Sequence, residues 1–259
     1  NQSGALHVQR IRRVQYPLRY RATHEDGETR KSLRFTKLEA WRLTEYQKVV
    51  LIDTDTMVLR SVDALFTCAA GTAVADQGAP GHFNSGIFVL EPSEATYREL
   101  LRLAPLLRSY NQGDQGFLNK AFPEWHERPE MRLPERFNYF LKWRGTNAWF
   151  SRSWALGVHV VHFTDIIKPH NWYLHPTMRD GAYGPAKQSF VAQNGDMFQR
   201  WRSLADEFEC ERGSWRVCNR TVLATRAEQC RAATSEHAAA ASFPDQLSVV
   251  ISHAPFRNR

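Results

Sequence analysis

The chain has 259 residues, of which 42% are hydrophobic and 12% aromatic, so it is long enough to bury the core of one large α/β domain. Its formal net charge of +7 is compatible with nucleic acid, anionic membrane or acidic small molecules as partners. Aromatic residues do not alternate with the basic clusters at 7–13 and 30–34, and no helix-turn-helix or zinc-finger spacing is present, which disfavours nucleic-acid binding. No apolar run reaches the roughly 18 residues of a membrane span.

The first elements along the chain are predicted to be a strand, a polar loop and a helix. Hydrophobic residues alternate over residues 8–16, as in a strand, and residues 23–29 are polar. Leu38 and Trp41 recur at helical spacing within residues 35–46, which favours a helix with one buried face.

Two aspartates follow the next predicted strand directly. Residues 49–52 are all apolar, which is typical of a strand buried on both faces in a parallel sheet. Asp53 and Asp55 come after it, at the edge where ligands of open α/β sheets bind. On an extended segment, side chains two residues apart point the same way, so both carboxylates could face one divalent cation. The pair would also suit a haloacid-dehalogenase-type phosphatase with Asp53 as nucleophile, although Met57 disfavours that motif.

The remaining elements are predicted from periodicity and from turn residues. Strands are expected at 71–75, 85–90, 158–163 and 247–252, with a turn at 78–81 and helices at 93–107, 112–118 and 191–207. Ser93 is the expected N-cap of the helix at 93–107, and its inner side is predicted to carry Tyr97, Leu100, Leu101 and Leu107. The cysteine-containing sequence at 209–243 is expected to be a linker or tail.

The cysteines bear on the cellular compartment. Cys210, Cys218 and Cys230 cluster without the spacing of a zinc site. Asn219 begins an Asn-X-Thr sequon inside this cluster, and Asn1 begins a second sequon. Together these features favour the Golgi or secretory-pathway lumen, with the cytoplasm as the alternative.

Five ordered blocks resemble the glycogenin-like family 8 glycosyltransferases. They are FTKL at 35–38, the aspartates after 49–52, FNSGIFV at 83–89, GDQGFLN at 113–119, and HF at 162–163 followed by KP at 168–169. The run at 109–119, with Trp125 and His126 after it, is similar to the plant glycogenin-like and xylan glucuronosyltransferase branch. The resemblance covers about residues 8–207.

The resemblance implies an α/β fold of the GT-A type, a Rossmann-like mixed sheet flanked by helices. The family's first βαβ unit should precede residue 8 and is not found there, so a catalytic domain at 1–208 would be incomplete at its N-terminus. Residues 209–243 would be the tail, and residues 244–259 would begin a further domain.

The implied activity is retaining transfer of a hexose or hexuronic acid from a UDP-sugar to a glycan or protein acceptor, with Mn²⁺ or Mg²⁺ as cofactor. The implied partners are the donor and the acceptor, with a homodimer as a further expectation and no nucleic acid. A non-catalytic, nucleotide-sugar-binding module is the first alternative, because Asn111 replaces a family aspartate and Asp165 a family glycine. The phosphatase is the second.

The resemblance also implies roles for individual residues. Asp53, Asp55 and His162 would bind the metal, and Lys168 would neutralise the departing diphosphate. The donor would be bound by residues that come from several blocks, namely Lys37, Thr54, Asp76, Asn84, Ser85 and Lys168. Asp114 and Gln115 would lie by the anomeric carbon, in a turn kept open by Gly113 and Gly116. The simpler alternatives are a helix N-terminal carboxylate for Asp114, a packed histidine for His162 and a solvated lysine for Lys168.

Overall fold

The computed structural model describes residues 34–164, 168–174, 185–212 and 248–252. The chain divides into two compact units, of which the first comprises Asn1–Tyr139, Arg152–Val161 and Asp245–Arg259, and the second Phe140–Ser151 and His162–Pro244. Several predictions fall outside the described residues. They are the strand at 8–16, the loop at 23–29, the absence of a first βαβ unit, and most of the tail at 209–243.

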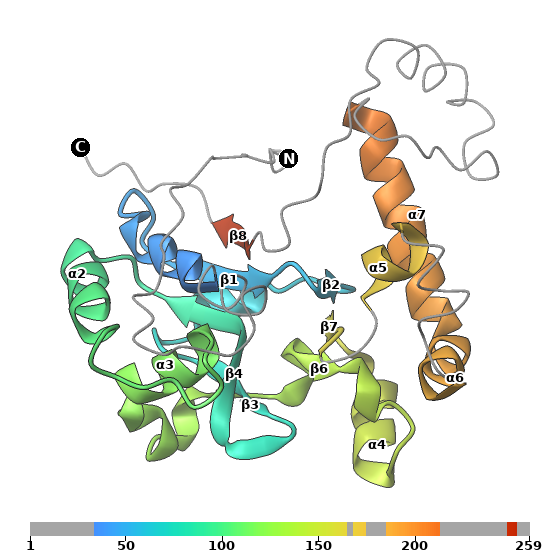
Figure 1. The fold of residues 1–259 in the computed structure, drawn as a ribbon, viewed down its shortest axis with the longest axis horizontal. Helices are drawn as coiled ribbons and strands as arrows, with labels where there is room; N and C mark the ends of the chain where they lie inside the picture. Colours follow the sequence, from blue (N-terminus) through green and yellow to red (C-terminus); the bar gives the residue numbers. More distant parts are fainter. Residues whose placement is uncertain (1–33, 165–167, 175–184, 213–247, 253–259) are drawn as a thin grey trace, which may run out of the picture. The chain divides into compact units, whose positions relative to one another are not determined.

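The first unit contains a five-stranded mixed sheet with helices packed on it, which confirms the predicted α/β class (Figure 1). Its order is β5 (Arg132–Leu133), β3 (Ala73–Asp76), β4 (Ala79–Leu90), β1 (Val49–Asp53) and β8 (Ser248–Ser252). The β3–β5 pair is parallel, and the other three pairs are antiparallel. A second sheet has the order β2 (Thr56–Val58), β7 (Val160–His162) and β6 (Tyr139–Phe140).

Strand β1 is buried as predicted, but the prediction that it lies in a parallel sheet is wrong. Val49 is paired with Leu90 of β4 and with Ser252 of β8, and both pairings are antiparallel. Val49 and Leu51 pack into one hydrophobic cluster, whereas Val50 and Ile52 pack into another. The unbroken apolar run therefore reflects burial of both faces of the strand and carries no information about the direction of its neighbours.

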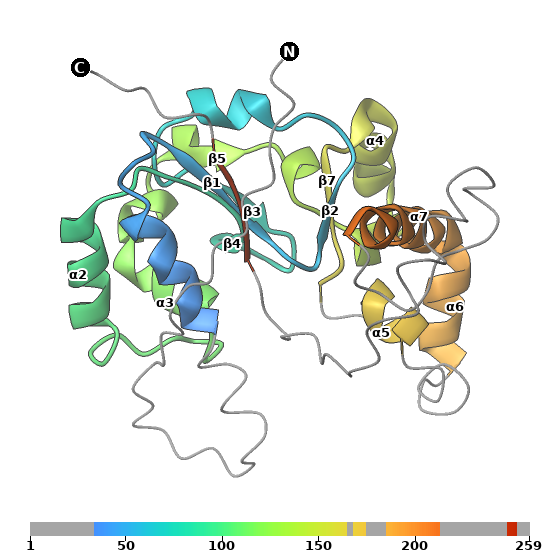
Figure 2. The same ribbon diagram turned by 90° about the horizontal axis from the view of Figure 1, so that it is seen from above.

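Helices cover both faces of this sheet (Figure 2). One face packs against the 3-10 helix η1 (Arg34–Arg42), α2 (Glu94–Leu103) and α3 (Asp114–Ala121), and the other packs against η2 (Asp63–Thr67). Four short 3-10 helices complete the described middle of the chain: η3 (Pro123–His126), η4 (Pro129–Met131), η5 (Glu135–Phe137) and η6 (Leu141–Trp143).

Helix α2 confirms the predicted N-cap, because the Ser93 hydroxyl accepts a hydrogen bond from the Thr96 amide at 3.2 Å. The helix ends at Leu103, four residues earlier than predicted. Leu100 is buried, but Leu101 is 36% exposed, so the inner-side prediction for Leu101 is wrong. The turn between β3 and β4 lies at 77–78, before the predicted 78–81.

The second unit is mainly helical in its described part, which also includes the last residues of β6 and β7. The predicted helix at 191–207 is two helices, α6 (Pro185–Gln193) and α7 (Gly195–Arg212), separated at the buried Asn194. Helix α5 is Pro169–Leu174, and α4 (Ala148–Gly157) crosses the boundary between the units. Among the described residues, no helix is both long enough and apolar enough to span a membrane.

Candidate functional site

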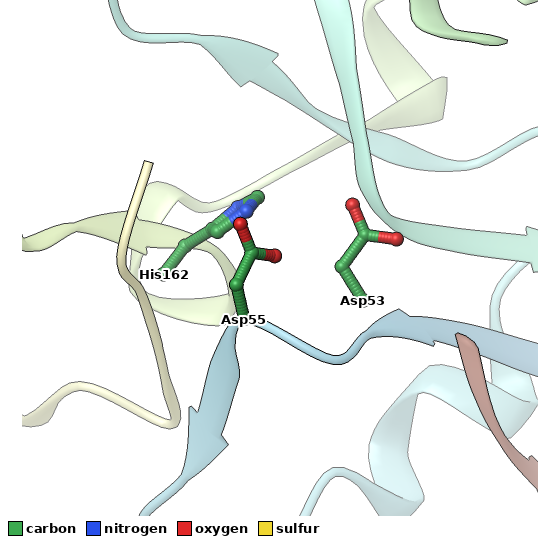
Figure 3. A group of neighbouring side chains, drawn as sticks. All are labelled: Asp53, Asp55 and His162. Atoms are coloured by element: carbon green, nitrogen blue, oxygen red, sulfur yellow. The ribbon is translucent and has the colours of Figure 1, made fainter. Parts of the chain in front are cut away.

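Asp53, Asp55 and His162 come together at the ends of β1 and β7. One potential ligand atom from each lies within 4.8 Å of the others. Figure 3 shows the Asp55 carboxylate beside the His162 ring, with Asp53 next to them at the end of β1. The unit boundary falls between Val161 and His162, inside β7, so the strand that carries His162 begins in the same unit as both aspartates.

The two carboxylates converge for a different reason from the predicted one. Residues 54–55 form a turn instead of continuing the strand, and the Thr56 hydroxyl closes it by donating to the Asp53 carbonyl oxygen at 2.6 Å. Thr54 is exposed within this turn. The prediction that residues 53–55 form one extended segment is therefore wrong, although the two aspartates lie close together.

The donor set fits a divalent cation. Two carboxylates and one imidazole suit Mn²⁺, and carboxylate oxygens also suit Mg²⁺. His162 is only 4% exposed, and its ring packs edge-on against Phe140 with 5.6 Å between the ring centroids. The packing orients the imidazole, so the packed-histidine reading and the metal-ligand reading are compatible.

Lys37 connects this group to the N-terminus of α3. Its ammonium lies 2.6 Å from Asp53 Oδ1 and 2.6 Å from Asp114 Oδ2. Burial lowers the pKa of Lys37, but the carboxylates of Asp114 and Asp53 outweigh it and raise the pKa well above its usual value. Lys37 is therefore a permanent buried cation between two carboxylates.

Asp114 is held ionised by the same contact. Burial raises the pKa of Asp114, but the Lys37 ammonium and the Ser85 hydroxyl, which donates at 2.8 Å, bring the pKa below its usual value. Asp114 is 4% exposed, so this is a buried negative charge with two specific donors. Its place in the first turn of α3 also favours the negative charge through the helix dipole.

Three amide and carboxylate side chains form a second polar group beside Asp114. Asn84 Nδ2 donates to Gln115 Oε1 at 2.7 Å and lies 3.4 Å from Asp76 Oδ2, and Gln115 Nε2 donates to Asp76 Oδ2 at 3.1 Å. The other oxygen of Asp76 accepts from the backbone amides of Gly78 and Ala79, which fixes its carboxylate at the β3–β4 turn. Predicted site residues from β3, β4 and α3 thus meet in one network.

The turn before α3 is tightly packed. Asn111 Oδ1 accepts hydrogen bonds from the amides of Gly113 and Gly116, at 3.0 and 3.1 Å. A Cβ atom on Gly116 would lie 2.5 Å from Ser109 Oγ and 2.7 Å from the Tyr110 amide nitrogen. Glycine is therefore required at position 116 by close backbone approach. Asn111 has a structural role that an aspartate oxygen could also fill.

Sequence reasoning missed two buried asparagines. Asn138 is fully buried, and its Nδ2 donates to Asn84 Oδ1 at 2.8 Å. Asn119 accepts from the Phe83 amide and donates to the Phe83 carbonyl, both at 2.9 Å, which ties α3 to β4. Asn119 closes the GDQGFLN block and could have been found there, whereas Asn138 lies outside every quoted block.

Lys168 belongs to the second unit, and it contacts another residue of that unit. Its ammonium donates to the carbonyl oxygen of Phe163, the residue after His162. This contact makes Lys168 a partly buried, hydrogen-bonded lysine and disfavours the solvated-lysine reading. Asp165, the other predicted departure from the family pattern, lies outside the described residues.

Comparisons with known proteins identify the family of the chain. Residues 5–172 match the model of the family "Glycosyl transferase family 8". The chain is 39% identical to Glycogenin-1 of Caenorhabditis elegans over 171 residues, which are 66% of this chain and 36% of that protein. It is 40% identical to human Glycogenin-1 over 54% of this chain and 41% of that protein. Against UDP-glucuronate:xylan alpha-glucuronosyltransferase 1 of Arabidopsis thaliana it is 38% identical, over 40% of this chain and 15% of that protein.

The chain thus spans well under half the length of these relatives. The family match nevertheless covers more than half of the chain and contains Lys37, both aspartates, the Asp76–Asn84–Gln115 network and His162. The expected resemblance is confirmed: the chain belongs to glycosyl transferase family 8.

Proposed function

We propose that this chain carries the catalytic site of a UDP-sugar-dependent glycosyltransferase. It would transfer a hexose or hexuronic acid to a glycan or protein acceptor with retention of anomeric configuration. One observation carries the proposal: Lys37 connects the candidate metal group to Asp114. Its ammonium contacts Asp53 of the Asp53–Asp55–His162 group and also contacts Asp114.

The metal-binding role falls to Asp53, Asp55 and His162. A bound Mn²⁺ or Mg²⁺ would neutralise the diphosphate and stabilise charge on the departing UDP. Lys168 is proposed to pair with the same diphosphate, as a second positive charge. Thr54, exposed between the two aspartates, is proposed to contact the nucleotide.

The sugar-binding role falls to the network beside Asp114. Asp76, Asn84 and Gln115 offer amide donors together with amide and carboxylate acceptors, the groups that recognise sugar hydroxyls. Asn138 and the β3–β4 turn fix the orientations of Asn84 and Asp76 before any donor binds. Such preorganisation lowers the cost of positioning the sugar.

Asp114 is proposed to stabilise the reacting carbon. Positive charge develops at the anomeric carbon as the bond to UDP breaks, and an ionised carboxylate nearby would stabilise it. The Lys37 ammonium and the Ser85 hydroxyl keep Asp114 ionised. Lys37 and Ser85 are also proposed to contact the donor. Same-face attack within an ion pair would give retention without a second catalytic carboxylate.

The donor sugar, the partners and the compartment stay predictions. Three Arabidopsis relatives are named for UDP-glucuronate and xylan, one of them provisionally, which supports hexuronic acid as an alternative to a hexose. The acceptor, the homodimer and the Golgi or secretory-lumen location are expectations, with the cytoplasm as the alternative. The cysteine side chains and sequons that favour the lumen lie outside what the structure describes.

Release of UDP from UDP-glucose, UDP-galactose and UDP-glucuronate tests the proposal directly. With Mn²⁺, the chain should hydrolyse one donor without any acceptor, and chelation of the metal should abolish release. Asp114→Asn should reduce release about 100-fold or more, whereas the exposed Asp63→Asn should behave like the wild type. Donor binding without release or transfer would favour the non-catalytic module, and covalent phosphoaspartate at Asp53 would favour the phosphatase.

A further inference from the structure

Three aromatic side chains form a surface row next to the sugar network. Tyr110 is 46% exposed, His82 is half-buried and His126 is exposed. The His82 and Tyr110 ring centroids lie 4.7 Å apart, and those of His82 and His126 lie 5.4 Å apart. These three residues are called the aromatic shelf below.

The shelf is supported from beneath. His126 packs edge-on against Trp125, with 6.0 Å between the ring centroids. Trp125 is only 1% exposed, and its indole nitrogen donates to the Met131 carbonyl at 3.1 Å. Trp125 therefore anchors the His126 end of the shelf to the core of the first unit, and His82 connects His126 to Tyr110.

One hydrogen bond joins the shelf to the candidate site. Gln115 Nε2 donates to Tyr110 Oη at 3.0 Å and to Asp76 Oδ2 at 3.1 Å. The contacts run from Asp53 through Lys37 and Asp114 to the Asn84–Gln115–Asp76 network, and then to Tyr110. The metal group is at one end of this series of contacts, and the shelf is at the other end.

We propose that the aromatic shelf is an acceptor subsite that binds a pyranose ring of a neutral oligosaccharide. The inference rests on the proposed transferase function and deepens it by naming the substrate class. The exposed Tyr110 ring offers apolar contact to the C–H face of a pyranose. The His82 ring is tilted by 59° to Tyr110 and lies at 89° to His126, so the imidazole nitrogens and the Tyr110 hydroxyl offer hydrogen bonds to the sugar hydroxyl groups. The shelf side chains carry no carboxylate or permanent cation, which suits an uncharged ring.

The order of the contacts assigns this ring to the acceptor instead of the donor. In the proposed function, the diphosphate occupies the metal end and the donor sugar occupies the network around Asp76, Asn84 and Gln115. Since Gln115 contacts both Asp76 and Tyr110, a ring on the shelf would be the next sugar along, within reach of the anomeric carbon. Tyr110 would help to select the acceptor.

Saturation-transfer NMR on the 259-residue chain tests this subsite, with UDP and Mn²⁺ present and xylohexaose and maltohexaose as probes. At least one probe should bind. Tyr110→Ala should raise its Kd about tenfold and His82→Ala severalfold, the loss expected for a ring contact. Tyr110→Phe, which keeps the ring and removes the hydroxyl group, should raise the Kd less than Tyr110→Ala. Trp149→Ala, an exposed aromatic substitution in the second unit, should leave the Kd unchanged.

Calorimetry of UDP with Mn²⁺ on the same variants separates the two proposals. Unchanged UDP binding together with a weakened oligosaccharide affinity in Tyr110→Ala would support the subsite. If neither probe binds, or if the oligosaccharide Kd is the same in Tyr110→Ala and the wild type, the subsite is overturned while UDP binding still supports the transferase. Shelf-dependent oligosaccharide binding without any UDP binding would show a carbohydrate-binding surface, and it would contradict both the transferase and the assignment of the shelf as an acceptor subsite.

Discussion

The Lys37 ammonium lies 2.6 Å from a carboxylate oxygen of Asp114, and the same ammonium lies 2.6 Å from Asp53. One buried cation thus compensates a carboxylate proposed to bind metal and a carboxylate proposed to face the reacting sugar. The arrangement couples the electrostatics of the two groups, so a change at Lys37 should be detectable at both.

Lys37→Met should destabilise the fold by about 3 kcal/mol, because it removes the partner of a buried carboxylate. It should also strengthen binding of Mn²⁺ alone severalfold, since a positive charge beside Asp53 is lost. Urea unfolding and calorimetry measure the two effects. Lys120→Met, which removes an exposed lysine of α3, should change stability by less than about 0.5 kcal/mol. Equal Mn²⁺ affinities in Lys37→Met and the wild type would contradict the coupling.

The Asp114–Lys37 pair should make stability depend on acid pH. The pKa of Asp114 is lowered from its usual 3.8 in the folded state, so its contribution is fully present above pH 3.8 and is lost as the pH falls through the folded-state pKa. Asp114→Asn should cost about 2 kcal/mol at neutral pH, because Lys37 keeps Asp53 as a partner.

The difference in free energy of unfolding between the wild type and Asp114→Asn should therefore narrow below about pH 4. Urea titrations at a series of pH values measure this difference. A constant difference between pH 7 and pH 2 would show that the pKa of Asp114 is not lowered by folding.

Gly116→Ala should destabilise the fold by about 2 kcal/mol and slow the release of UDP from the donor sugar. The added Cβ would lie 2.5 Å from Ser109 Oγ and 2.7 Å from Asn111 Oδ1, so the turn that positions Asp114 and Gln115 must shift. Gly195→Ala is the matched control, because no heavy atom lies within 4 Å of its added Cβ. Thermal unfolding should show a lower Tm for the first variant and an equal or higher Tm for the second. Equal Tm shifts would contradict the account.

The sequence predicted the elements better than their arrangement. The apolar run at 49–52 identified β1 and its burial, but strand direction depends on distant partners in β4 and β8. Leu100 and Leu101 are both leucines of α2, yet Leu100 is buried and Leu101 is exposed. Burial depends on which side of α2 packs against the sheet, and composition does not determine that side. Asn194 interrupts what periodicity presents as one helix.

The candidate site was predicted largely through the family resemblance. Asp76, Asn84 and Gln115 are far apart in sequence, and no local pattern indicates that their side chains meet. Asn138 could not be predicted, since it lies between Phe137 and Tyr139 outside every quoted block. Its role depends on a long-range contact with Asn84. Sequence periodicity does not report such contacts.

Calorimetric titration of UDP, with and without Mn²⁺, tests the central claim most directly. The wild type and the exposed Asp63→Ala control should bind UDP only when Mn²⁺ is present. Asp55→Ala should lose this binding, because it removes a carboxylate from the proposed metal group. UDP affinity that is independent of Mn²⁺ or unchanged in Asp55→Ala, or no UDP binding by the folded wild-type chain, would contradict the account.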